Sequence, residues 1–140
     1  MHLEFDASYR VSPATGAEYL ILAGDIGNPS HEDYVKFLED AASKFKQVFL
    51  ITGNHEAYGS SVARTHAAVD RVVAQPSMQG RVTHLQRKAF DVPCVDGSVV
   101  RVLGATLWSD VCAGSPAYAR SYLSDFRLIE GMTIQVRARG

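Results

Sequence analysis

The sequence predicts an α/β fold in which a strand–helix–strand unit is followed by a helix and further strands. Three observations support this prediction: two apolar runs that each end at Gly, an amphipathic stretch between them, and a later change to strand-like patterns around an Asp-Gly turn. Apolar runs that end at Gly are typical of buried strands, and apolar side chains three or four residues apart are typical of helices. The order βαβα, then strands, favours a mixed sheet that extends from a parallel pair.

The first strand is expected over residues 17–24 and the second over residues 47–52. Between them, Ser30 is a candidate helix N-cap, and Glu32 and Asp33 place negative charge in the first turn of the helix. Because crossovers between parallel strands are right-handed, this helix would bring the second strand back parallel to the first. The apolar stripe of the helix consists of Val35, Leu38, Ala42 and Phe45.

In the second half of the chain, the spacing of apolar residues changes from a pattern typical of helices to one typical of strands. Residues 61–75 have a helical pattern that ends at Pro76 and Gly80. Asp96-Gly97 lies between two strand-like runs and predicts a hairpin. Strands are expected over 82–85, 88–95 and 98–107, and a short helix over 117–130. Trp108 is expected to anchor the core, because a large aromatic side chain contributes much buried area.

Composition limits the class of protein. With 140 residues, 46% hydrophobic and 21% charged, the chain is expected to form at most one globular domain. A net charge of −1 with both signs scattered gives no signal for nucleic acid or membrane partners. His2, Glu4 and Asp6 stand where a signal peptide would be apolar, so a cytoplasmic location is expected. Cys94 and Cys112 are expected to be buried thiols.

Polar side chains follow both of the expected parallel strands. Asp25 comes directly after Gly24, and Asn54, His55 and Glu56 come directly after the Gly that ends the second strand. Since the carboxyl ends of parallel strands meet at one sheet edge, these residues are expected to face a common ligand site. A carboxylate can bridge two divalent metal ions, and an amide oxygen can bind a metal without adding negative charge.

These motifs resemble those of the calcineurin-like metallophosphoesterases. The resemblance lies in Ala-Gly-Asp-Ile-Gly at 23–27 and Thr-Gly-Asn-His-Glu-Ala-Tyr at 52–58. Met-His-Leu-Glu-Phe at 1–5 and Gly-Ala-Thr-Leu-Trp-Ser-Asp at 104–110 support it. It implies that residues 1–140 form a single partial domain, an incomplete metallophosphoesterase-like α/β sandwich.

The resemblance also implies a function, hydrolysis of a phosphate ester by metal-bound hydroxide. Two divalent metal ions, Mn, Fe or Zn, would clamp the phosphoryl oxygens, with His2, Asp25 and Asn54 among their ligands. His55 would act catalytically near the leaving group, as a general acid or by stabilising charge. Glu56 would support the site by orienting an imidazole or a neighbouring backbone group.

The remaining candidates are weaker. Asp110, beyond the last expected strand, is a candidate for the rim of the site. His31, His66 and His84 are expected to be structural or solvated, because an isolated His makes no metal site.

Part of the family pattern is missing from the sequence. The Asp that should precede His2 by two residues lies upstream of Met1, and no His follows His84. We therefore expect an incomplete version of a longer enzyme, whose exposed sheet would favour self-association. The alternative is a short protein that serves as a non-catalytic binding or regulatory module on the same scaffold. A nucleotide-binding α/β protein is disfavoured, because the loop after residues 17–24 lacks a Gly-rich pattern. The substrate and the choice of metal stay open.

Overall fold

The computed structural model describes residues 9–13, 16–109 and 116–133, which form an α/β fold with two sheets. In chain order the elements are β1 (Tyr19–Ala23), α1 (Glu32–Lys44), β2 (Gln47–Ile51), η1 (His55–Ala57), α2 (Val62–Val73), η2 (Pro76–Met78), β3 (Val82–His84), β4 (Lys88–Pro93), β5 (Val99–Gly104), α3 (Pro116–Tyr122) and α4 (Asp125–Leu128). Strands β1, β2 and β3 form a parallel sheet in that order, and β4 pairs with β5 in an antiparallel hairpin. The predicted α/β class, with a βαβ unit at its start, is confirmed.

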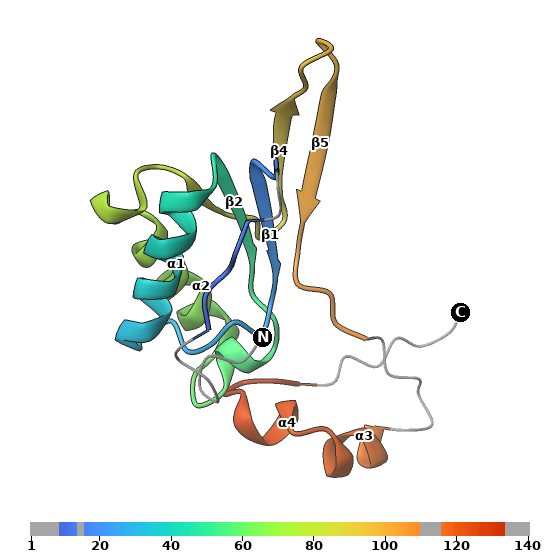
Figure 1. Cartoon of the computed structure of the whole chain (residues 1–140). Helices are drawn as coiled ribbons and strands as arrows, with labels where there is room; N and C mark the ends of the chain where they lie inside the picture. The colour runs from blue at the N-terminus through green and yellow to red at the C-terminus, as the bar shows by residue number, and fades with distance from the viewer. Residues whose placement is uncertain (1–8, 14–15, 110–115, 134–140) are drawn as a thin grey trace.

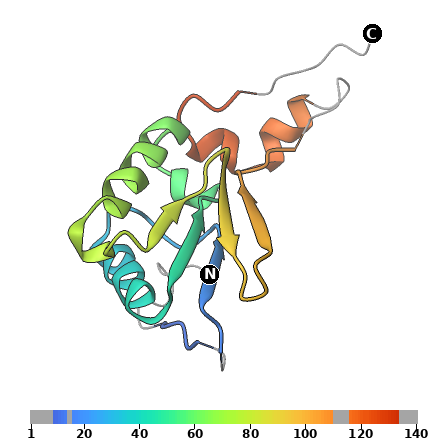
Figure 2. The same ribbon diagram turned by 90° about the horizontal axis from the view of Figure 1, so that it is seen from above.

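The central strand β2 is buried on both faces, which explains its continuous apolar sequence. Val48 and Leu50 pack with α1 and α2 in the main core, where Leu38 and Val69 are fully buried. Phe49 points to the other face and packs in a second cluster beneath the hairpin. Figures 1 and 2 show the two helices on one side of the parallel sheet and the hairpin on the other. The alternation within β2 thus organises both layers.

The hairpin forms around the predicted Asp-Gly turn. Gly97 has φ +83°, a conformation that Gly adopts without steric conflict. Its N–H donates to the Cys94 carbonyl at 3.1 Å, and the Asp96 carboxylate accepts from the Ser98 N–H at 2.9 Å. The prediction of a hairpin at this turn is confirmed, with β4 and β5 shorter than the strands expected from the sequence.

The predicted N-cap of the first helix is wrong. His31, not Ser30, is the N-cap of α1, and its side chain makes no capping hydrogen bond. Ser30 lies one residue earlier, where its N–H donates to the Asn28 side-chain oxygen at 2.9 Å. This local Asn-based turn shifts the helix start by one residue. By contrast, α2 begins conventionally, since the Ser61 hydroxyl accepts from the Arg64 N–H.

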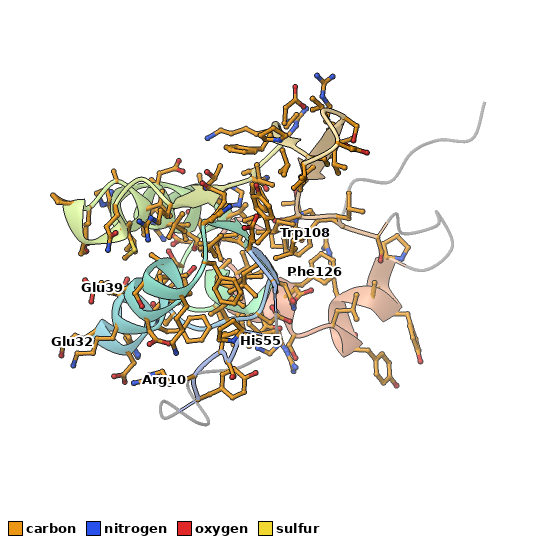
Figure 3. All side chains as sticks on the ribbon, turned by 45° about the horizontal axis from the view of Figure 1, so that its top comes forward. Arg10, Glu32, Glu39, His55, Trp108 and Phe126 are labelled. Carbon is orange, nitrogen blue, oxygen red and sulfur yellow. The ribbon has the colours of Figure 1, made fainter. Side chains whose placement is uncertain are left out.

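Two predictions of burial are also wrong. Trp108 is 39% exposed, because it lies in an irregular segment beyond the end of β5 at Gly104. Figure 3 shows this side chain away from the helices α1 and α2. Cys94 is only half-buried, since it lies in the hairpin loop, and Cys112 is outside the described residues.

The last described segment forms two short helices, α3 and α4, where one helix was expected over 117–130. Segment 124–130 is docked on the loop after η1. The Gly59 N–H donates to the Leu128 carbonyl at 2.8 Å, and the Glu130 N–H donates to the Ser60 carbonyl at 2.7 Å. This docking places α4 beside the loops that follow β2 (Figure 1). No helix in the three described ranges is long and apolar enough to cross a membrane.

Candidate functional site

The turns after β1 and β2 touch one another at the carboxyl edge of the parallel sheet. Gly24 has φ +93°, and a Cβ atom there would lie 2.7 Å from the Gly53 backbone nitrogen. A Cβ atom on Gly53 would overlap the Asp25 carboxylate. Both positions therefore require Gly. Gly24 allows the close approach of the Gly53 backbone, and Gly53 leaves the space into which the Asp25 carboxylate fits.

Glu56 ties these two turns together. Its carboxylate is 2% exposed and accepts three backbone N–H groups, those of Gly53 at 2.8 Å, Asp25 at 3.1 Å and Ile26 at 2.6 Å. A buried carboxylate is stable only when it is satisfied in this way. Of the two roles considered for Glu56, these contacts correspond to the orientation of backbone groups.

Asp25 is held in an uncommon backbone conformation. Its φ is +52°, in the left-handed region that Asp tolerates better than most residues. One carboxylate oxygen accepts from the His55 N–H at 3.2 Å, so Asp25 lies against the residue that follows Asn54. The structure thus brings Asp25 and the Gly-Asn-His-Glu turn together, as parallel strands predict.

Asn54 is fixed by its amide nitrogen. This atom donates to the Asp125 carboxylate at 2.7 Å and to the Tyr58 hydroxyl oxygen at 3.1 Å. The half-buried His55 ring stacks on Tyr58, with ring centroids 4.5 Å apart. Burial, together with a hydrogen bond to and the charge of Asp125, raises the pKa of Tyr58 to about 12. Tyr58 therefore stays protonated at neutral pH, and its hydroxyl donates a hydrogen bond to the Asp125 carboxylate at 2.8 Å.

Asp125 and Tyr58 contact the candidate ligand Asn54, and sequence reasoning missed both. Tyr58 belongs to the motif at 52–58 and could have been found as its last member. Asp125 carried no signal, because a single carboxylate at the start of a short helix is ordinary. Two of the sequence-predicted site residues, His2 and Asp110, lie outside the described residues.

A second polar cluster lies beside the first, between α2 and the ends of β2 and β3. The buried His84 ring meets the Asp70 carboxylate at 2.8 Å, and its Nε2 atom is buried without a hydrogen-bond partner. His66 contacts the Thr52 hydroxyl at 3.1 Å and lies edge-on to His84 at 5.5 Å between centroids. Burial, followed by His84, lowers the pKa of His66. These contacts agree with a structural role for both histidines.

The fit of a metal ion can be judged from the oxygen donors at the sheet edge. The Asp25 carboxylate and the Asn54 amide oxygen are suitable ligands for a divalent cation. Among the described residues, however, no group of three His, Cys, Asp or Glu side chains is placed to hold a metal ion. The described part of the site therefore supplies two suitable oxygen ligands for a divalent cation, which is part of the set that a metal ion needs.

With this geometry established, comparison with known proteins identifies the family. The sequence profile of the calcineurin-like phosphoesterases matches residues 4–132, and the chain belongs to this family. The resemblance seen in the two Gly-terminated motifs is thereby confirmed. Members of the family are hydrolases that generally use divalent metal ions.

A curated relative is similar over most of the chain. It is the uncharacterized protein L509 of Acanthamoeba polyphaga mimivirus, 26% identical over 113 residues. The match covers 80% of this chain but only 39% of the relative, so the chain spans about two fifths of the relative's length. No solved structure matches the chain.

Proposed function

We propose that this chain carries part of the active site of a metal-dependent phosphoesterase. The observation that supports the proposal is the meeting of the Asp25 and Asn54 turns at one sheet edge, where the Asp25 carboxylate accepts from the N–H that follows Asn54. The buried Glu56 carboxylate accepts from backbone N–H groups of both turns. Oxygen donors gathered at the carboxyl edge of a parallel sheet are typical of a ligand site. The rigid backbone fixes these donors before a ligand arrives.

Asp25 and Asn54 are the oxygen ligands in this proposal, and His2 is a nitrogen ligand. Two divalent cations, when bound, would neutralise charge on a phosphate ester and make water a better nucleophile. A set of carboxylate, amide and imidazole ligands is compatible with Mn, Fe and Zn. The Gly53 position keeps the Asp25 carboxylate against the Asn54 turn, because any side chain there would displace it.

His55 is the proposed catalytic residue. It directly follows Asn54, and its ring is half-buried against Tyr58, which limits its orientation. An imidazolium in this place can donate a proton to the leaving-group oxygen of a phosphate ester or stabilise its charge. Its removal should therefore slow the reaction without removing the oxygen ligands.

The second candidate function is a non-catalytic binding or regulatory module on the same scaffold. It is favoured by the small number of ligands, since the described ranges contain no complete group of three metal-binding side chains. Such a module would bind divalent cations weakly and release no phosphate.

Phosphate-ester hydrolysis separates the two candidates. The assay measures nitrophenol release from 4-nitrophenyl phosphate and bis(4-nitrophenyl) phosphate, with and without Mn²⁺. The proposal predicts Mn²⁺-dependent turnover that is lost in Asp25→Ala and Asn54→Ala and reduced by about 10²- to 10⁴-fold in His55→Ala. Asp33→Ala, which removes an exposed carboxylate from α1, is the matched control and should retain full activity.

Either of two results would decide against the proposal. Turnover in Asp25→Ala equal to that of the parent would show that the reaction does not use this edge of the sheet. Retained Mn²⁺ binding with no turnover on either ester, even after the missing family motifs are restored at both ends of the chain, would favour the binding module.

A further inference from the structure

The side chains of Asn54, Tyr58 and Asp125 form a closed triangle of hydrogen bonds. The Asn54 amide nitrogen donates to both partners, at 2.7 Å to Asp125 and 3.1 Å to Tyr58. The Tyr58 hydroxyl then donates to the same Asp125 oxygen at 2.8 Å. An amide nitrogen donates through its hydrogens and accepts nothing, so both contacts of this Asn54 atom are donor contacts.

This triangle determines which way the Asn54 amide faces. An ionised carboxylate accepts hydrogen bonds and donates none, so the atom of Asn54 that faces Asp125 must be nitrogen. The Tyr58 hydroxyl hydrogen already forms a hydrogen bond to Asp125, so the Tyr58 oxygen can only accept a hydrogen bond from Asn54. The Asn54 oxygen is consequently turned away from α4, and no donor within the described ranges occupies it. A flipped amide would place its oxygen against two acceptors.

Asp125 is brought to Asn54 from a distant part of the chain. The two residues are 71 positions apart, and Asp125 is the first residue of α4. Backbone hydrogen bonds from Gly59 to Leu128 and from Glu130 to Ser60 fix this segment on the loop after η1. The placement of Asp125 thus depends on tertiary docking of α4.

We propose that Asp125, assisted by Tyr58, is a positioning residue that fixes the Asn54 amide with its oxygen available to a divalent cation. This inference rests on the proposed function, since it gives a reason for the orientation of one proposed ligand. Hydrogen-bonded groups behind a metal ligand commonly set its orientation, and their removal lowers metal affinity by about 10- to 100-fold.

The test combines Mn²⁺ affinity with a readout that needs no metal. Calorimetry gives the Mn²⁺ dissociation constant of the full 140-residue chain and of Asp125→Asn, Asp125→Ala and Tyr58→Phe. In the metal-free protein, NMR measures solvent exchange of the Asn54 side-chain NH₂, whose signals are assigned by their loss in Asn54→Ala. Glu130→Gln is the matched control, because it removes an ion pair with Arg64 from the same segment without touching Asn54.

We expect Asp125→Ala to weaken Mn²⁺ binding by about 10- to 100-fold and to speed exchange of the Asn54 amide hydrogens. Asp125→Asn keeps one acceptor oxygen, which is the number that Asn54 and Tyr58 use, and should have a smaller effect. Tyr58→Phe keeps the Asn54–Asp125 hydrogen bond and should have a smaller effect, while Glu130→Gln should match the parent. Slow exchange of the Gly59 N–H, which donates to Leu128, shows whether α4 stays docked in each variant.

The outcomes separate this inference from the proposed function. A parent chain that binds Mn²⁺, with Asp125→Ala binding equally well and an unchanged Asn54 amide, would overturn the inference alone. A parent chain that takes up no Mn²⁺ would overturn the proposed function and, with it, the role of Asp125 in metal binding.

Discussion

Replacement of Glu56 by Gln should destabilise the protein more than any single change of a surface charge. The carboxylate accepts three backbone N–H groups, at 2.6, 2.8 and 3.1 Å, while its side chain is 2% exposed. Gln keeps one oxygen but directs an NH₂ group at a backbone N–H, so at least one hydrogen bond is lost and donor faces donor.

The magnitude follows from the nature of these hydrogen bonds. A hydrogen bond to a charged group contributes about 1.5–3 kcal/mol, and a buried donor left without a partner costs about 1–3 kcal/mol. Part of the loss is recovered because Asp25 and Gly53 are only half-buried and can bind water. We therefore expect Glu56→Gln to lower the free energy of unfolding by about 3 kcal/mol. For a chain of this length, that corresponds to a fall in Tm of about 10 °C.

Thermal unfolding followed by circular dichroism measures this effect. The matched control is Glu18→Gln, which removes one charge from an exposed ion pair with Lys46 and should cost less than about 1 kcal/mol. Equal Tm values for the two variants would refute the reasoning, because Glu56 would then hold the two turns no more strongly than a surface carboxylate does.

The remaining predictions concern the Gly turn, pH and the exposed sheet. Gly53→Ala should abolish Mn²⁺ binding in calorimetry by displacing the adjacent carboxylate, whereas Gly80→Ala, with φ +68° but open space around it, should retain binding. Burial and His84 lower the pKa of His66, so the unfolded state binds more protons. Stability should fall as the pH drops through 6.5 towards the lower folded-state pKa, and the fall should be smaller in His66→Gln when denaturant midpoints are compared. We also propose that the chain self-associates through its exposed sheet, where Ile21 is 58% exposed. Ile21→Lys should then reduce the mass measured by sedimentation, and an unchanged mass would argue against this surface.

The sequence was sufficient for the parts of the fold that local patterns determine. The apolar runs of β1 and β2, and the helical spacing of α1 and α2, predicted the elements because side-chain periodicity reflects which faces are buried. The N-cap of α1 was missed by one residue, since Ser30 lies in a local turn in which its N–H donates to the Asn28 side chain. The spacing of apolar residues gives no information about such a turn.

The candidate site could be predicted only in part, because some of its contacts depend on tertiary packing and not on local sequence patterns. Asp25 and Asn54 were found because the carboxyl ends of parallel strands meet at one edge of a sheet. The bonds of Glu56 to residues some 30 positions away depend on how closely the two Gly turns approach, which is a tertiary property. Asp125 could not be found at all, because docking of α4, rather than any local pattern, brings it to Asn54.

The most direct test of the central claim is to locate Mn²⁺ on the protein by paramagnetic broadening of backbone amide signals. The account predicts that substoichiometric Mn²⁺ broadens the signals of residues 24–26 and 53–56 and that Asp25→Ala removes this effect. Broadening centred on His66 and His84, or none anywhere in the spectrum, would contradict a metal site at the meeting of the two Gly turns.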